Sequence, residues 1–211
     1  MQTLYLGLDP TNFLCAGTLI HYPVIRTARI ESSDLQQALD LWHEFTHAIF
    51  TSQTAVKYWE NDLKGKVVIA IGEATADSLR KRGVEPLVAP QATQEGVIQL
   101  LEMLLHAGKL QNPFVFFPHS TLSREVFPQF LQRSKIRFFG LALYETILQK
   151  IEPVPDLSEV GEIVFTSPST VMGFLAIYGA IPLDKKLTSI GPITEKALTR
   201  LYQNAFLPSH H

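Results

Sequence analysis

The stretch FTSQTAV (residues 50–56) returns later in the chain as FTSPSTV (residues 165–171). Each copy follows an apolar run and places a serine directly before a segment of helical composition. Serine is a preferred N-cap residue, so each copy predicts a buried strand that ends at the start of a helix.

A second repeated motif follows each of these stretches. AIGEAT (residues 70–75) matches SIGPIT (residues 189–194). The offset is 115 residues from Thr51 to Thr166 and 119 residues from Gly72 to Gly191. Two motifs in the same order at nearly the same offset predict two homologous α/β units.

Strand-like and helix-like segments alternate along the rest of the chain. Several strand candidates are continuous apolar runs, which suits strands covered on both faces, and the alternation is typical of a doubly wound parallel sheet. We expect strands at residues 3–9, 24–30, 48–51, 67–71, 86–88, 114–117, 136–143, 163–166 and 187–190, and helices at 33–45, 75–82, 93–106, 123–132 and 194–202.

Composition excludes several classes of protein. The 211 residues include 46% hydrophobic ones, enough for a core, and the net charge of -2 argues against a nucleic-acid binder. The single cysteine, Cys15, cannot form an intramolecular disulfide or a cysteine-based zinc cage. No apolar run reaches the length of a membrane helix, so we expect a soluble, cytoplasmic protein without a signal peptide.

The repeated turns are the candidate anion site. The carboxyl ends of parallel strands are where ligands bind, and a helix N-terminus presents backbone N–H groups and a partial positive charge. For one motif alone, a well-formed turn is the better interpretation; the recurrence of both motifs favours a shared anionic ligand, although duplication would also preserve turns. The candidate binding residues are Thr51, Ser52, Gly72, Thr75, Thr166, Ser167, Pro168, Ser169, Gly191 and Thr194.

Together these motifs resemble the uroporphyrinogen-III synthase family. The resemblance covers most of the chain from about Tyr22 onward, and it rests on the order of segments that are weak singly. Besides the two motif pairs, they are ATQEGVIQLL (residues 92–101), SREVFPQFL (123–131) and LYETI (143–147).

The resemblance implies an architecture and a reaction. It implies two flavodoxin-like domains, residues 1–31 plus 151–211 and the inserted residues 33–147, joined by two crossing segments with a ligand cleft between them. The family converts hydroxymethylbilane, a linear tetrapyrrole with eight carboxylates, to uroporphyrinogen III in heme biosynthesis, inverting ring D and losing water. It implies no cofactor and no metal, a monomer, and possible transient contact with the preceding pathway enzyme.

The resemblance also singles out two residues for roles. Tyr144 matches the family tyrosine in the Tyr-x-Thr motif, and a protonated phenol can assist departure of the substrate hydroxyl. A structural tyrosine packing in the crossing segment is the alternative. Arg124 matches a basic residue of the Ser-Arg-Glu segment and is a candidate for binding a propionate; a solvated arginine paired with Glu125 or Gln129 is an equal alternative.

Two departures from the family pattern concern the ends of the chain. The first strand ends in Leu8-Asp9-Pro10 where Thr-Arg-Pro is usual, which exchanges a cation for an anion. The stretch before Pro23 is short for the first family helix, and the last strand and helix of the family are largely missing. We therefore expect the first domain to be shortened at both ends.

Two other functions remain as alternatives. The segment HEFTH, from His43 through Glu44 to His47, formally matches a zinc-hydrolase motif, which requires both histidines on one helical face. We expect the helix to end within the motif, which makes this interpretation a weak one. The other alternative is a non-catalytic two-lobed protein that binds an anion with the same turns.

Overall fold

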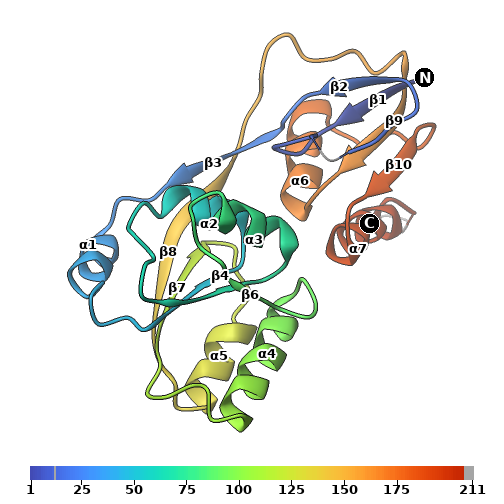
Figure 1. Cartoon of the computed structure of the whole chain (residues 1–211). Coiled ribbons are helices and arrows are strands. Elements are labelled where there is room, and N and C mark those ends of the chain that lie inside the picture. The colour runs from blue at the N-terminus through green and yellow to red at the C-terminus, as the bar shows by residue number, and fades with distance from the viewer. Residues whose placement is uncertain (12, 207–211) are drawn as a thin grey trace, which may run out of the picture. The chain divides into compact units, whose positions relative to one another are not determined.

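The computed structural model describes residues 1–11 and 13–206, which form two compact units (Figure 1). The discontinuous unit contains residues 1–26 and the chain from Thr146 onward. The continuous unit contains residues 27–145. Each unit has its own sheet and its own core, so each is described separately.

The continuous unit is a doubly wound sheet with helices on both faces. Its strands run in the order β8-β7-β4-β5-β6, all parallel where they pair, with β3 beside β8 at the edge. The elements are β3 (Ile25–Arg29), α1 (Ser33–Asp40), β4 (His47–Phe50), α2 (Gln53–Tyr58), β5 (Val67–Ala70), α3 (Glu73–Arg80), β6 (Leu87–Val88), α4 (Gln94–His106), β7 (Phe114–Ser120), α5 (Val126–Arg133) and β8 (Arg137–Leu148).

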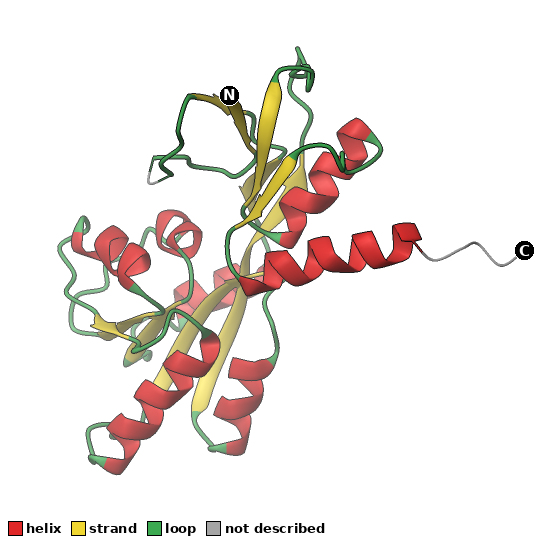
Figure 2. Ribbon diagram, turned by 90° about the vertical axis from the view of Figure 1, so that its right-hand side faces the viewer, coloured by secondary structure: helices red, strands yellow, loops and turns green. Residues whose placement is uncertain are grey.

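Two apolar clusters hold this sheet between its helices. On one face Phe50 and Phe116 pack with residues of α1, α2 and α3, and Trp59 lies 4.3 Å from the Phe116 ring. On the other face Ile69 and Phe117 pack with residues of α4 and α5. Figure 2 shows strands flanked by helices in this unit. Neighbouring strand residues therefore face opposite cores, which explains the continuous apolar runs in the sequence.

The discontinuous unit repeats this topology in a permuted form. Its strands run in the order β10-β9-β1-β2 and are parallel, and α6 and α7 share one core with them. If β9 is taken as the counterpart of β4, this order corresponds to the order β5-β4-β7-β8 in the continuous unit. The elements are β1 (Gln2–Tyr5), β2 (Thr18–His21), β9 (Val160–Phe165), α6 (Pro168–Tyr178), β10 (Lys186–Ser189) and α7 (Pro192–Phe206).

The strand order qualifies the predicted fold class. Numbered along the chain, the discontinuous unit reads 2-1-3-4, which follows flavodoxin as far as it goes. The five parallel strands from β4 to β8 read 3-2-1-4-5, which is not the flavodoxin order. The strands compared here are parallel in both sheets, as predicted, and the sheet of the continuous unit has helices on both faces. The strand order depends on which strands pair, so it cannot be read from the alternation of segments in the sequence.

The helix predicted at residues 33–45 is shorter than expected. It ends at Asp40, and the chain then turns so that Phe45 enters the core with only 2% exposure. The Lys66 ammonium donates hydrogen bonds to the carbonyls of Trp42 (2.8 Å) and Phe45 (2.7 Å), and it lies over the Trp42 ring. A distant lysine therefore stabilises a turn that the local apolar periodicity did not indicate.

The stretch between β1 and β2 contains no helix among its described residues. The described residues of this stretch form a loop between β1 and β2, and β2 itself, a short strand of mixed composition, was not predicted. In the loop the Phe13 ring lies 5.2 Å from the ring of Tyr5, so part of the sheet is covered by an aromatic contact. The sheet accordingly carries polar residues, Thr3 and Glu162, at buried positions.

Glu162 on β9 is an acidic residue of that sheet, and its contacts predict a pH dependence. Its carboxylate accepts hydrogen bonds from Thr188 (2.6 Å) and Thr3 (3.4 Å) and pairs with the Lys186 ammonium at 2.8 Å. Lys186 foremost, and then Thr188, lower the pKa of Glu162. A carboxyl whose pKa is depressed on folding contributes stability above its unfolded pKa, and this contribution is lost as the pH falls through the folded pKa.

Glu162→Gln is expected to flatten the acid side of the stability profile. Below about pH 5 the free energy of unfolding should fall less steeply in this variant than in the parent protein, as measured by urea titrations at successive pH values. Glu152→Gln is the matched control, because Glu152 is exposed and its pKa is lowered by the exposed Lys150. Equal slopes for the parent and Glu162→Gln would contradict this role of Glu162.

Candidate functional site

Two repeated turns lie at topological switch points, one in each sheet. In the continuous unit the order reverses between β4 and β7, and Thr51 and Ser52 follow β4 there. In the discontinuous unit it reverses between β9 and β1, where Thr166 and Ser167 follow β9. Crevices at the carboxyl ends of strands beside a switch point are the usual ligand sites of such sheets.

Tyr144 meets Ser52 at the switch point of the continuous unit. The phenol oxygen of Tyr144 on β8 lies 2.8 Å from Oγ of Ser52, a residue 92 positions earlier in the chain. Ser52 is the N-cap of α2, and its Oγ accepts a hydrogen bond from the backbone N–H of Ala55 at 3.0 Å. The candidate acid and one candidate binding residue are therefore directly hydrogen-bonded.

The surroundings of Tyr144 keep its phenol protonated and in place. Tyr144 is 8% exposed, and burial raises its pKa, while the hydrogen bond between Tyr144 and Ser52 has a smaller effect in the opposite direction. The Thr121 N–H donates to the Tyr144 carbonyl at 3.0 Å, and the Tyr58 ring lies 6.0 Å away. A buried phenol that is neutral at physiological pH suits a proton donor.

The Ile-Gly-x-x-Thr motif of the continuous unit is partly covered by the chain itself. Gly72 is the N-cap of α3 and has extended backbone geometry. A Cβ at Gly72 would lie 2.9 Å from Cβ of Ala92. The lack of a side chain therefore makes room for the loop after β6 and does not leave the backbone open to a ligand. Thr75 is buried within α3. The binding roles of both residues stay predictions. The structure leaves less room for a ligand beside them than the sequence suggested.

The matching motif of the discontinuous unit is open. Gly191 has a φ of 85°, which favours glycine, and nothing lies within 4 Å of a Cβ placed there. Thr194 is buried, and its hydroxyl donates to the Ile190 carbonyl at 3.1 Å. Of this pair, Gly191 offers accessible backbone, while Thr194 stabilises the turn.

The two Phe-Thr-Ser turns also differ in their free donors. In the second copy Oγ1 of Thr170 accepts from the N–H groups of Thr166 (3.1 Å) and Ser167 (3.2 Å), and Ser167 in turn accepts from the Thr170 N–H. Pro168 has no N–H, so the donors left at this turn are the Ser169 N–H and the hydroxyls of Thr166, Ser167 and Ser169. The first copy has Ala55 where the second has Thr170, so no hydroxyl closes it in the same way.

Arg124 is held by a partner that the sequence analysis did not name. Its two terminal nitrogens donate to the two carboxylate oxygens of Glu95, both at 2.8 Å. This bidentate pair lowers the pKa of Glu95 to about 2 and raises that of Arg124. The expected neighbours Glu125 and Gln129 are not its recorded partners. A propionate would have to compete with Glu95 for this guanidinium.

Arg124→Gln is therefore expected to change kcat/KM for the reaction that the resemblance implies by no more than about threefold, because the pair is exposed and already neutral. Glu95→Gln is the matched variant, since it frees the guanidinium without removing it. Steady-state kinetics of both variants checks this expectation. A tenfold rise in KM for Arg124→Gln alone would restore Arg124 as a substrate residue.

Gln94 joins the same two segments and was missed at the sequence level. Its buried amide donates to Oγ of Ser123 (3.2 Å) and accepts from the Phe127 N–H (3.3 Å), which caps α5 from another helix. The ATQEG and SREVF segments thus bind each other, and α5 begins at Val126, later than predicted. The sequence showed only a glutamine near the start of a predicted helix, and its burial became visible in the structure.

The His-Glu-x-x-His segment does not form a zinc motif. His43 lies in the turn after α1, and its Nδ1 bonds to the Asp40 carbonyl at 3.1 Å. Glu44 pairs with Arg137 at 2.9 Å, and His47 is buried in β4, where burial lowers its pKa. The two histidines therefore do not share a helical face, and the described residues contain no cluster of three or more potential ligands.

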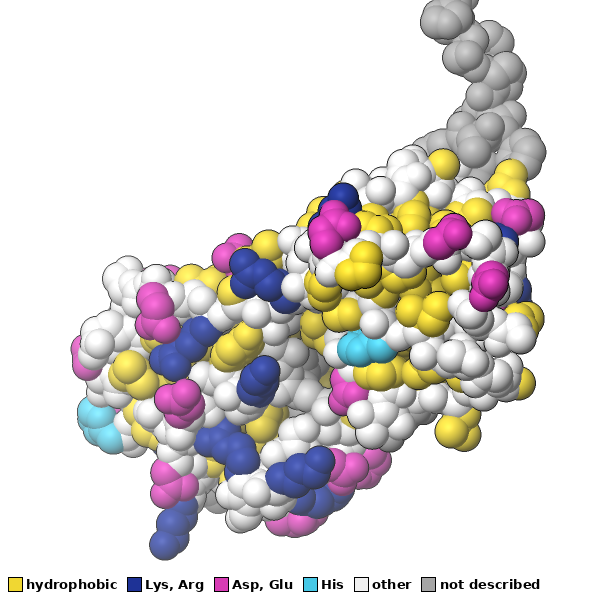
Figure 3. Space-filling view, turned by 90° about the horizontal axis from the view of Figure 1, so that it is seen from above, with side chains coloured by type: hydrophobic (Ala, Val, Ile, Leu, Met, Phe, Trp, Pro, Cys, Tyr) yellow, Lys and Arg dark blue, Asp and Glu magenta, His cyan; other side chains and the backbone are white. Residues whose placement is uncertain are grey.

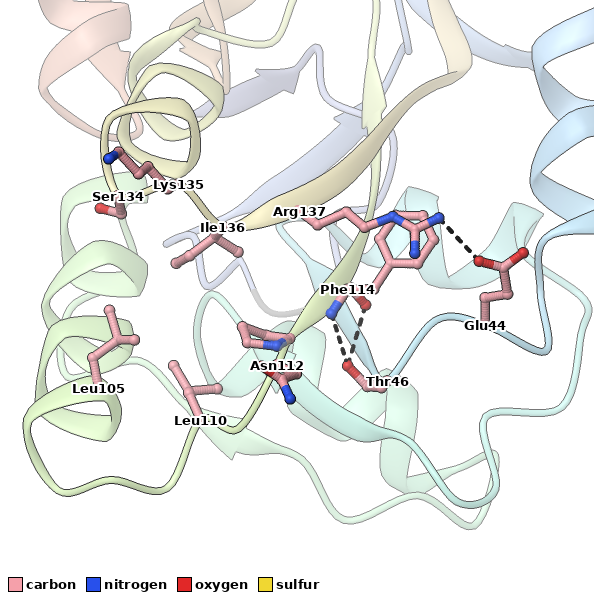
Figure 4. Close-up of a pocket in the computed structure, with 11 residues that line it drawn as sticks. Glu44, Thr46, Leu105, Leu110, Asn112, Phe114, Ser134, Lys135, Ile136 and Arg137 are labelled. Atoms are coloured by element: carbon pink, nitrogen blue, oxygen red, sulfur yellow. Dashed lines mark hydrogen bonds and ion pairs between the residues drawn. The ribbon is translucent and has the colours of Figure 1, made fainter.

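A hollow of about 730 Å³ lies at the opposite end of the continuous unit (Figure 4). It is lined by the starts of β7 and β8 rather than by their carboxyl ends. Some of its polar groups bond to one another: Arg137 pairs with Glu44 and lies 3.6 Å over the Phe114 ring, and the Thr46 hydroxyl accepts from the Phe114 N–H. None of the predicted site residues lines it.

Charge is not concentrated on the surface that Figure 3 shows. Lys and Arg side chains there are interspersed with Asp and Glu. This distribution agrees with the net charge of -2. Among the described residues, no helix has the length and apolar character needed to cross a membrane.

The fold and the turns define a duplicated α/β protein with serine-capped helix starts at the switch points of parallel sheets. Comparison with known families assigns it further. The chain belongs to the uroporphyrinogen-III synthase family, because the family model for uroporphyrinogen-III synthase HemD matches residues 16–210. The enzymes of this family are cyclising lyases.

Solved structures agree with the fold. Uroporphyrinogen-III synthetase from Helicobacter pylori is 17% identical with a TM-score of 0.65, covering 99% of this chain and 91% of that one. A mutant uroporphyrinogen III synthase from Thermus thermophilus is 16% identical with a TM-score of 0.59, covering 95% and 89%. The wild-type Thermus enzyme reaches 0.51 at 17% identity, covering 95% and 88%. No curated protein matches the sequence significantly.

Proposed function

We propose that this chain cyclises hydroxymethylbilane to uroporphyrinogen III with Tyr144 as the proton donor to the leaving hydroxyl. The observation that carries the assignment of Tyr144 is its hydrogen bond to Ser52 at a switch point, in a chain that belongs to this family. A phenol placed there is protonated, buried and next to the turn expected to bind the substrate.

The proposed first step loses water from the substrate. The carbon–oxygen bond of the hydroxymethyl group breaks, the electron pair stays on oxygen, and the Tyr144 proton completes the water molecule. The pyrrole nitrogen supplies the electrons that leave an electrophilic azafulvenium, and Tyr144 is left as a phenolate. The substituted α-carbon of ring D then bonds to the electrophilic carbon and gives a spiro intermediate. The bond between that α-carbon and its original methylene bridge breaks, and the bridge carbon bonds to the other α-carbon of ring D. The proton lost from this second α-carbon returns to the phenolate and restores the acid.

Substrate carboxylates are proposed to bind at the carboxyl edges of the two sheets. The proposed donors are Thr51 and the backbone N–H of Ser52 in the continuous unit, and Thr166, Ser167, Ser169 and Gly191 in the discontinuous unit. Backbone N–H groups contribute as much as side chains there, so no cofactor is needed for recognition. Holding the bilane in a folded conformation is positioning catalysis, which selects the ring-inverted product.

The organisation of the chain belongs to the same proposal. The two units are proposed to act as two domains, residues 1–31 plus 151–211 and residues 33–147, with the flavodoxin-like description applying to the discontinuous one. Cytoplasmic location, a monomeric state and contact with the preceding pathway enzyme stay predictions. Limited proteolysis that releases a stable fragment near residues 33–147 would support the boundaries.

Isomer analysis of the product tests the function directly. Freshly made hydroxymethylbilane is supplied to the purified protein, and isomers I and III of the product are separated. Isomer III in excess over the protein-free reaction supports the proposal. Isomer I alone, together with saturable binding of the bilane, would favour the non-catalytic anion-binding alternative.

A further inference from the structure

We propose that Ser52 is a positioning residue that donates its hydroxyl proton to the Tyr144 oxygen and so directs the phenolic proton away from the pair, toward substrate. This inference rests on the proposed function of Tyr144. It gives the Ser52 hydroxyl a part in proton transfer, which is a different role from binding a substrate carboxylate. Its basis is the geometry of three groups: Tyr144, Ser52 and the Ala55 N–H.

The hydrogen-bond inventory of this cluster leaves two arrangements. A serine hydroxyl has one proton and two acceptor positions, and the Ala55 N–H occupies one acceptor position at 3.0 Å. Across the 2.8 Å contact, either Tyr144 donates to Ser52 or Ser52 donates to Tyr144. In the first arrangement the proton not used in this contact is that of the serine hydroxyl, which is weakly acidic. In the second arrangement it is the proton of the phenol.

The second arrangement is the one that suits an acid. A hydroxyl that already accepts from a backbone N–H is polarised and becomes a better donor. After the phenol gives up its proton, Ser52 remains hydrogen-bonded to the phenolate, which burial would otherwise destabilise. The same contact therefore aims the proton before the transfer and stabilises the anion afterwards.

Other contacts fix the positions of Ser52 and Tyr144. The Thr121 N–H holds the Tyr144 backbone, and α2 is fixed at its other end by Tyr58, whose hydroxyl donates to the Thr27 carbonyl at 2.9 Å. Tyr58 is the titratable side chain recorded against the Tyr144 ring, and its own proton is committed to Thr27. Arg82 also binds carbonyls at the end of α2, including that of Val56 at 2.9 Å.

Three substitutions at Ser52 separate capping from proton donation. Ser52→Thr retains both the cap and the hydroxyl. Ser52→Asp retains the cap, because aspartate is as good an N-cap as serine, but its carboxylate cannot donate to a phenol. Ser52→Ala loses both. Ser32→Ala is the matched control, since Ser32 caps α1 through the Leu35 N–H at 3.2 Å and has no tyrosine partner recorded.

The first readout is the pKa of Tyr144 itself. The six tyrosines are replaced biosynthetically by 3-fluorotyrosine, whose phenol titrates at lower pH, and the Tyr144 resonance is assigned by its absence in Tyr144→Phe. We expect the pKa of Tyr144 to rise by about one unit in Ser52→Ala, more in Ser52→Asp, and little in Ser52→Thr or Ser32→Ala.

The second readout is the rate. We expect kcat to fall about tenfold in Ser52→Asp and Ser52→Ala with little change in KM, and the alkaline limb of the pH profile to move upward, whereas Ser52→Thr stays within about threefold. An unchanged Tyr144 pKa in Ser52→Ala would overturn the proposal, as would parental kcat in Ser52→Asp or a rise in KM alone. If the parent protein makes no isomer III, the proposed function fails, and the fluorine titration still decides whether Ser52 donates to Tyr144.

Discussion

Replacing Tyr144 with phenylalanine is expected to slow isomer III formation about tenfold or more, because the variant lacks the proton that completes the leaving water. The ring remains, so packing against Tyr58 and the surrounding core should be kept. The hydrogen bond to Ser52 is lost, but Ser52 still caps α2 through the Ala55 N–H, so unfolding should change little.

The measurement is the initial rate of isomer III formation, with thermal unfolding recorded for the same preparations. Tyr178→Phe is the matched control: it removes a partly buried phenol hydroxyl that donates to the Pro155 carbonyl at 3.0 Å and has no part in the proposed chemistry. Its rate should stay near that of the parent. An unchanged rate in Tyr144→Phe would end the assignment of Tyr144 as the acid and leave it a structural residue.

Of the glycine-to-alanine substitutions in the continuous unit, Gly96→Ala is expected to cause the largest loss of stability. A Cβ at Gly96 would lie 2.1 Å from the carbonyl oxygen of Gln91. That oxygen belongs to the backbone, and it also accepts from the Thr93 N–H at 2.8 Å. It therefore cannot move away from the new Cβ without disturbing this hydrogen bond. We expect a loss of about 3 kcal/mol in the free energy of unfolding.

The consequence should extend beyond α4. The first turn of this helix carries Gln94 and Glu95, which hold the start of α5 and Arg124. Urea unfolding of Gly96→Ala, beside Gly140→Ala as control, tests the expectation. At Gly140 the nearest atom would lie 3.5 Å from the new Cβ, an ordinary contact, so that variant should stay within about 0.5 kcal/mol of the parent. Equal stability of both variants would show that the turn at Gln91 can move.

Several features of the site were accessible from the sequence because they depend on neighbouring residues. A serine that precedes a helical segment caps it through an N–H three positions later, as Ser52 and Ser167 do. Continuous apolar runs indicated buried parallel strands, and the repeated motifs indicated the duplication, which the matching strand orders of the two units also display. The order of the segments also indicated the family, which the match over residues 16–210 confirms.

Other features could not be predicted, because they depend on contacts between distant segments. The end of α1 depends on Lys66, a residue more than twenty positions further on. Gly72 and Gly191 occupy the same position in the motif, yet one is covered by Ala92 and the other is open. Arg124 carried a charge suited to a propionate, and only the packing of α4 beside α5 showed that Glu95 already binds it.

By itself, then, the sequence determined the elements, the duplication and the chemistry available at each turn, since caps and hydrophobic periodicity act over a few residues. The tertiary structure decided which of these groups meet. Ser52 and Tyr144 are brought together because β4 and β8 both flank β7, a strand order that no local pattern encodes. The pairing that makes Tyr144 a candidate acid is therefore a property of the folded sheet.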